Sequence, residues 1–242
     1  MDIRQIILSA MAALIALTIH EYAHGYVAYK LGDGTAKALG RLSLNPMKHL
    51  DPFGALCMIF FHFGWAKPVP INARNFKDPK KGFALTALAG PAINLITGFF
   101  TIFVYLLCST YFKTSSSTFI NNLCINTLLF LIYFFSINIG LGIFNLIPIP
   151  PFDGSRILNV VLPPKWYFKI MQYEKNIYWG VIAWLLLGQY VYYALISVPF
   201  IASSPILSGI AGIFSLSGIL NSCITAITNG MIKFWMLFPI FK

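Results

Sequence analysis

The feature that most constrains the fold of this chain is a series of apolar stretches, each long enough to cross a lipid bilayer. A helix needs about 20 apolar residues to span the hydrocarbon core, and we predict spans at residues 6–30, 82–108, 124–147 and 177–200. A fifth stretch, 205–228, is rich in Gly, Ser and Asn and either crosses as well or lies in the membrane interface. Lipid leaves backbone polar groups without water, so spanning segments must pair those groups themselves. The sequence therefore predicts an all-α polytopic membrane protein with a bundle of about five transmembrane helices.

Composition supports the same class of protein. The 242 residues are 58% hydrophobic and only 10% charged, whereas soluble domains carry about 25% charged residues. The net charge of +10 suggests nucleic-acid binding at first sight. The basic residues gather in loops between apolar spans, however, and form no aromatic-basic module that reads bases. We therefore expect the lipid bilayer, and no nucleic acid, among the partners.

The distribution of Lys and Arg predicts the orientation of the chain. Thirteen of the 17 basic residues lie in two loops, residues 30–81 and 156–175. Because cytoplasmic loops carry the excess of Lys and Arg, these loops should face the cytoplasm and the N-terminus should lie outside. The expected location is the cytoplasmic membrane, which the chain crosses several times.

The loop between the first two spans contains an apolar run that is too short to cross. It covers residues 53–65, about 13 residues, and prolines stand on both sides of it. Such a length suits a re-entrant or interfacial element better than a transmembrane helix. We predict a short re-entrant segment or membrane-edge β-hairpin at residues 53–71. Its open edge would be available to an extended peptide.

The first span contains His20-Glu21-Tyr22-Ala23-His24, an H-E-x-x-H pattern. Ionisable side chains at bilayer depth cost roughly 2.5–3.5 kcal/mol each and usually mark a functional site. Residues i and i+4 share one face of a helix, so both imidazoles can reach one metal ion. The pattern is typical of zinc binding, with the glutamate as general base of a metalloprotease.

A catalytic zinc usually has three protein ligands and an open position, so a third ligand is needed. Asp153 is the strongest candidate, because Pro148, Pro150 and Pro151 precede it and end the third span. Gly154 then lets the backbone turn back. The alternative role for Asp153 is to cap the helix that follows. We predict that Asp153 joins His20 and His24 at a single zinc ion.

Several short motifs, in a fixed order along residues 10–160, carry a resemblance to a known family. They are H-E-x-x-H at 20–24, G-R-L-S-L-N-P at 40–46, H-L-D-P-F-G at 49–54, F-G-W-A-K-P-V-P-I-N at 63–72, G-P-A-I-N at 90–94 and N-L-I-P-I-P-P-F-D-G at 145–154. The chain resembles the site-2 protease family of intramembrane zinc metalloproteases, peptidase family M50. It is similar to the compact prokaryotic branch, which lacks PDZ and CBS domains.

The resemblance implies zinc held by the two histidines and Asp153, with Glu21 activating a water molecule. Asn94 and Asn145 match polar intramembrane positions of the family, and we expect them to bind substrate backbone or the developing oxyanion. Their alternative role is to join helices, as asparagine often does within membranes. The chain then divides into a catalytic membrane core, residues 1–175, and C-terminal membrane segments, residues 176–242.

The expected reaction is hydrolysis of a peptide bond within or near a transmembrane segment of a membrane-protein substrate. His24 lies six residues before Lys30, so the site should open toward the cytoplasmic face. The alternatives are a membrane metal-ion transporter or sensor, or a homologue that binds helices without cutting them. Transporters often show inverted repeats, which the sequence lacks. A regulatory membrane protein is a further possible partner, and the sequence leaves open the substrate, the oligomeric state and the roles of His49 and His62.

Overall fold

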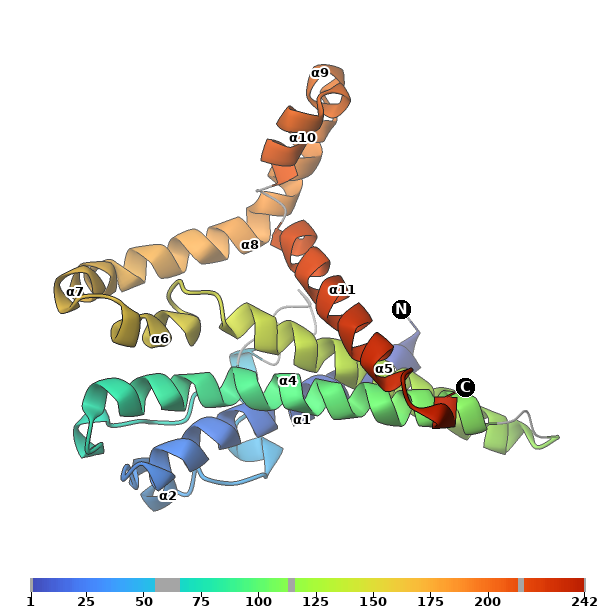
Figure 1. Cartoon of the computed structure of the whole chain (residues 1–242), viewed down its shortest axis with the longest axis horizontal. Coiled ribbons are helices and arrows are strands. Elements are labelled where there is room, and N and C mark those ends of the chain that lie inside the picture. Colours follow the sequence, from blue (N-terminus) through green and yellow to red (C-terminus); the bar gives the residue numbers. More distant parts are fainter. Residues whose placement is uncertain (1, 55–65, 113–115, 213–215, 242) are drawn as a thin grey trace.

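The structure is a computed structural model of the chain and describes residues 2–54, 66–112, 116–212 and 216–241. Three long helices form its core: α1 (Ile3–Lys30), α4 (Pro79–Tyr111) and α5 (Thr118–Asn145). Each packs against the other two, and they run side by side in Figure 1. Among the described residues, these three helices are long and apolar enough to cross a membrane. They confirm the first three predicted spans.

The count of about five spans is not confirmed. The fourth predicted span corresponds to α8 (Glu174–Ile196), and the fifth stretch divides into α10 (Pro205–Gly212) and α11 (Leu216–Trp235). None of them is among the candidate spans found in the described residues.

Close approach of the core helices depends on glycine. A Cβ added to Gly98 of α4 would lie 2.5 Å from Ile139 Cδ1, and one added to Gly142 of α5 would lie 2.8 Å from Leu95 Cδ2. The Ile139 side chain has no room to withdraw, since it is fully buried. Small residues at helix contacts replace the hydrophobic driving force that is missing within lipid. The core is therefore tight enough to hold side chains from different helices in fixed positions.

The C-terminal elements extend away from this core and then return to it (Figure 1). After α5 come α6 (Gly154–Val161), which packs on α4, and α7 (Pro164–Gln172), which leads into α8. Arg156 of α6 donates to Glu174 Oε1 of α8 over 2.9 Å. Beyond α8, the short helices α9 (Pro199–Ser203) and α10 lie farthest from α1.

Helix α11 makes the return contact with the core. Its Trp235 lies against Phe99 and Phe103 of α4, with ring centroids 4.7 and 4.5 Å away, and donates its indole N–H to the Phe99 carbonyl over 3.0 Å. The chain then ends in a 3-10 turn, η3 (Pro239–Phe241).

The loop between α1 and α4 crosses beside α1. It contains α2 (Thr35–Ala38) and the 3-10 turns η1 (Pro46–Lys48) and η2 (Ala73–Asn75). The central part of the predicted re-entrant segment or hairpin, residues 55–65, lies outside the described residues. Around it, the structure describes one isolated antiparallel bridge, Leu50 with Ala66, and no longer strand in the parts of the loop it covers. We call the non-helical residues 66–72 the strap.

Candidate metal centre

The two histidines of the H-E-x-x-H pattern lie on one face of α1, and their rings meet. The Nε2 atoms of His20 and His24 are 3.0 Å apart. Both residues are buried, at 5% and 6% exposed. The i to i+4 spacing of a helix is the cause, since one turn separates the two side chains.

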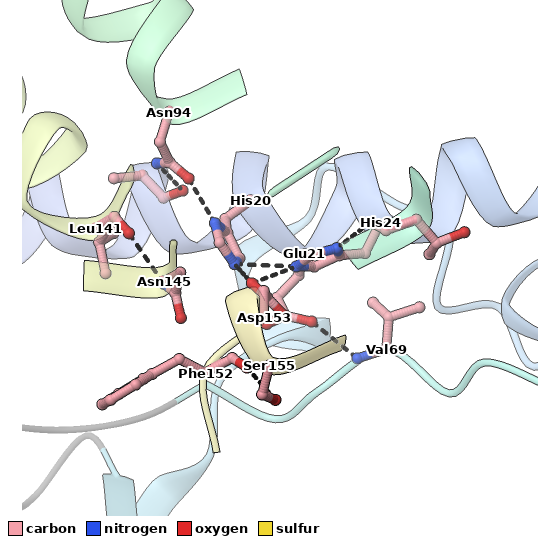
Figure 2. A network of polar contacts seen from close by, with 12 residues as sticks. His20, Glu21, His24, Val69, Asn94, Leu141, Asn145, Phe152, Asp153 and Ser155 are labelled. Carbon is pink, nitrogen blue, oxygen red and sulfur yellow. Dashed lines mark hydrogen bonds and ion pairs between the residues drawn. The ribbon is translucent and has the colours of Figure 1, made fainter. Parts of the chain in front are cut away.

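Asp153 joins them from the turn between α5 and α6. Its Oδ2 atom lies 3.1 Å from His20 Nε2 and 3.2 Å from His24 Nε2 (Figure 2). Zinc bonds of 2.0–2.1 Å in a tetrahedron place neighbouring ligand atoms about 3.3 Å apart. The three atoms therefore form a triangle close to one face of a zinc tetrahedron. The donor set, two imidazoles and one carboxylate, fits a zinc ion with an open fourth position.

The turn before α6 brings Asp153 to this place. Helix α5 ends at Asn145, and the chain folds back so closely that a Cβ on Gly154 would lie 2.5 Å from the Ile147 carbonyl oxygen. Phe152 packs against Phe144 of α5, with ring centroids 4.3 Å apart. Asp153 occupies the N-cap position of α6, but its side chain makes no capping hydrogen bond. Its carboxylate is instead directed to the histidines.

The outer nitrogens of both rings are held by acceptors. His20 Nδ1 lies 2.5 Å from Asn94 Oδ1, and His24 Nδ1 lies 2.7 Å from the Thr86 carbonyl oxygen. Because both partners are acceptors, each Nδ1 carries the hydrogen and each Nε2 presents its lone pair. Such bonds fix the tautomer and the ring orientation of histidine ligands. Both acceptors belong to α4, which thus aims two side chains of α1.

Asn94 is fully buried, and both its amide oxygen and its amide nitrogen form hydrogen bonds. Besides accepting from His20, it donates through Nδ2 to Asn138 Oδ1 over 2.8 Å and to the Ala16 carbonyl over 3.4 Å. Asn94 therefore joins α1, α4 and α5. These contacts differ from the substrate contact that the family resemblance predicts, and they favour the alternative role as a link between helices.

The second predicted asparagine lies at the end of α5. Asn145 donates from Nδ2 to the Leu141 carbonyl of its own helix over 3.1 Å and remains partly exposed. Figure 2 shows it beside Asp153 without a contact to either histidine. Its predicted role in substrate binding stays a prediction.

Gly90 has a role that the sequence analysis did not assign. A Cβ at this position of α4 would collide with His24 Nε2 and lie 2.6 Å from His20 Cε1. Only glycine lets α4 come this close to both rings. The available signal was the Gly90-Pro91 pair one turn before Asn94, since glycine within a helix often marks a close approach.

Glu21 faces a different partner from the histidines. Its Oε2 accepts the backbone N–H of Val69, in the strap, over 2.8 Å (Figure 2). Among the described residues, no donor pairs with Oε1. The cluster itself is most open at Asp153, whose side chain is 24% exposed, against 6% and 8% for the two histidines. Nothing in the sequence around Val69 indicated this contact, apart from the prolines on both sides.

His49, the other histidine that the structure describes, lies apart from the cluster. It is 1% exposed, and its Nε2 donates to the Ser43 carbonyl over 2.7 Å. His62 lies outside the described residues.

The sequence is related to known zinc metalloproteases. It is 42% identical over 193 residues to the putative zinc metalloprotease YwhC of Bacillus subtilis, covering 76% of this chain and 83% of the relative. It is 30% identical to the zinc metalloprotease MJ0392 of Methanocaldococcus jannaschii, over 67% of this chain and 37% of the relative. The putative zinc metalloprotease Rip2 of Mycolicibacterium smegmatis is 27% identical, over 63% of this chain and 56% of the relative. No solved structure shows a significant match.

The family model named peptidase family M50 matches residues 8–188. This range includes α4, α5, α1 from residue 8 onward, the strap and the residues of the cluster. The relatives indicate zinc as the cofactor, and His20, His24 and Asp153 form a group that could hold it. By the extent of this match and its identity to YwhC, the chain belongs to peptidase family M50.

Proposed function

We propose that the protein is an intramembrane zinc metalloprotease that hydrolyses a peptide bond within or near a transmembrane segment of a membrane-protein substrate. The observation that carries the proposal is the buried cluster of His20, His24 and Asp153 with Glu21 beside it. Two of its ligands lie on a helix that is apolar and long enough to cross a membrane.

In this proposal, three residues bind the ion and Glu21 transfers the proton. His20, His24 and Asp153 hold the zinc, and Asn94 and Thr86 keep the two rings in place. When bound, zinc supplies Lewis-acid chemistry, since it polarises the scissile carbonyl and makes a water molecule more acidic. Asn94 acts in this scheme as a positioning residue for His20, and Asn145 remains as a substrate contact.

Glu21 is the general base and then the general acid. Its Oε2 is occupied by the Val69 N–H, which leaves Oε1 to take a proton from the attacking water. As the water oxygen bonds to the carbonyl carbon and the C–N bond breaks, the proton passes from Glu21 to the leaving nitrogen. A substrate helix must unwind locally first, because its carbonyls are engaged in hydrogen bonds four residues apart.

The site opens toward the cytoplasmic face in this proposal. His24 lies about 9 Å along the helix from Lys30, at 1.5 Å per residue, and the basic loops follow at that end of α1 and before α4. The partners are a transmembrane substrate and the bilayer, with a regulatory membrane protein as a further candidate. The N-terminus lies outside the cytoplasmic membrane.

The test is Glu21→Gln in the purified full chain, with Glu174→Gln as the matched control. These are the only two glutamates of the sequence, and Glu174 of α8 pairs with Arg156 of α6 instead of facing the cluster. We expect Glu21→Gln to slow cleavage of a membrane-embedded substrate about 100- to 10,000-fold and to retain zinc.

The control should cleave within a few-fold of the unmodified protein. Cleavage at the original rate by Glu21→Gln would remove the general-base assignment. Retained zinc without cleavage of any membrane substrate, in the unmodified protein, would favour a homologue that binds helices without cutting them.

A further inference from the structure

The strap offers Glu21 a single hydrogen-bond donor. Val69 lies between Pro68 and Pro70, and proline has no backbone N–H, so the donor of this tripeptide is the Val69 N–H alone. It lies 2.8 Å from Glu21 Oε2. Val69 is 6% exposed, and its side chain packs beside Gly25, one helical turn after Glu21. The strap therefore contacts α1 beside the Glu21 side chain.

Both ends of the strap are held by charged side chains from the loop that follows α1. At one end, Arg41 Nη2 donates to the carbonyls of Lys67 and Pro68 over 2.7 and 3.3 Å. At the other end, Asp33 Oδ2 accepts the backbone N–H of Asn72 over 2.7 Å. Val69 lies between these two attachments.

Asp33 is a fully buried carboxylate that the proposed mechanism does not use. Its Oδ1 accepts the Thr35 N–H over 3.1 Å, the Thr35 hydroxyl, and Asn75 Nδ2 over 2.8 Å. With the Asn72 bond, the carboxylate joins the end of α1 to the strap and to η2. A buried charge is costly unless it is well hydrogen-bonded, and this one is bonded from both sides of the loop.

The strap is stiff enough to transmit this anchoring. Proline fixes its own φ and restricts the residue before it to extended conformations. Residues 67–70 therefore have few alternative shapes. Between Val69 and Asn72, Ile71 alone lies outside this restriction, so most of a displacement at Asn72 would be passed to Val69.

We propose that Asp33 is a positioning residue for Glu21: it fixes the strap against α1 so that the Val69 N–H sets the Glu21 carboxylate. The inference rests on the proposed function, because it assigns Asp33 a role in the same reaction. Asp33 touches neither the cluster nor Glu21, and it acts through Asn72 and Val69.

The first experiment measures cleavage kinetics and zinc content of Asp33→Asn. The change preserves shape but replaces one acceptor oxygen with an NH₂ group that faces other donors. Misplacement of a catalytic group by about 1 Å can cost 100-fold, so we expect kcat to fall about 10- to 100-fold, with KM within twofold and zinc unchanged. The control is Asp78→Asn, since Asp78 accepts the Lys81 N–H of its own helix and should leave kcat unchanged. An Asp33→Asn variant with the original kcat overturns the proposal.

The second experiment tests whether the effect passes through Val69. Val69→Pro removes the N–H, whereas Val69→Ala keeps it and trims only the side chain. Coupled residues give non-additive effects. We therefore expect Asp33→Asn to lower kcat fully in the Val69→Ala protein and to add no further loss in the Val69→Pro protein. A full additional loss in the Val69→Pro protein would show that Asp33 acts by another route.

The third measurement does not depend on cleavage. Amide hydrogen exchange of Val69 and Asn72 should be faster in Asp33→Asn than in the unmodified protein and in Asp78→Asn. Unchanged exchange at both amides overturns the anchoring. If the unmodified protein cleaves no substrate, the proposed function fails, while the exchange result still decides whether Asp33 holds the strap.

Discussion

The core helix α4 and the C-terminal helix α11 contain the same residue types in opposite surroundings. Gly90 of α4 lies against both histidines, whereas a Cβ at Gly230 of α11 would meet nothing within 4 Å. Asn94 of α4 is fully buried and bonded to His20, whereas Asn229 of α11 is exposed. Glycine and asparagine in an apolar helix therefore do not locate a site by themselves. The site is located by the contacts that these residues make with neighbouring atoms.

The extent of the family match agrees with this difference. It ends at residue 188, within α8 and before α11 begins. The residues that hold and surround the cluster belong to α1, α4, α5 and the turn before α6. Helix α11 contributes packing against α4 and α5, and Trp235 makes the ring contacts with α4.

The largest difference should come from adding one methyl group to each helix. We expect Gly90→Ala to displace His20 and His24, because the new Cβ collides with His24, and to abolish stable zinc binding. Overpacking of this kind also costs about 1–3 kcal/mol of stability. Gly230→Ala should be neutral, or stabilising by up to about 1 kcal/mol. Metal analysis and thermal unfolding of both purified variants measure this, and full zinc occupancy in Gly90→Ala would contradict it.

The next effect concerns the amide that orients His20. Removing the partner of a histidine ligand lowers metal affinity about 10- to 100-fold. We expect this loss for Asn94→Ala and none for Asn229→Ala, measured by competition with a zinc chelator. Equal affinities in the two variants would mean that the Asn94 bond does not orient the ligand, and the contrast between the two helices would lose its chemical basis.

A smaller effect is expected where the two regions touch. Trp235→Ala removes the ring contacts with Phe99 and Phe103 and the indole hydrogen bond. Aromatic pairs contribute about 0.5–1.5 kcal/mol each beyond their buried area, so the thermal midpoint should fall by a few degrees. Zinc content and cleavage should stay unchanged. A loss of zinc in this variant would show that α11 supports the metal centre after all.

The smallest effect is a pH dependence of the loop that follows α1. Burial alone would raise the pKa of the Asp33 carboxyl, but hydrogen bonds from Thr35, Asn72 and Asn75 lower it below its ordinary value of 3.8. A lowered pKa in the folded state stabilises the protein above the unfolded pKa and ceases to do so as pH falls through the folded value. The difference in melting temperature between the unmodified protein and Asp33→Asn should therefore be constant above about pH 5 and shrink below about pH 4. An increase of this difference in melting temperature on acidification would contradict the prediction.

The local patterns in the sequence predicted much of the core and the cluster. The two histidines were placed by helical spacing, and Asp153 by the prolines that end α5, because both depend on residues close in the chain. The long-range contacts were not predictable in this way. Periodicity shows which residues share a face of α4, but not that Asn94 and Gly90 face α1. The bonds from Val69 to Glu21 and from Asn72 to Asp33 depend on how the strap docks, and no local pattern encodes that.

The distance in sequence between the ligands also sets an order of events during synthesis. Asp153 follows His20 by 133 residues, which at about 5–20 residues per second are translated in roughly 7–27 seconds. Until then, α1 can lie in the membrane with Glu21 and two histidines but without the third ligand. By the time Asp153 arrives, α4 has already supplied Gly90 and Asn94. The last ligand is thus made after the parts that orient the first two, and a half-made chain has only two of the three residues of the cluster.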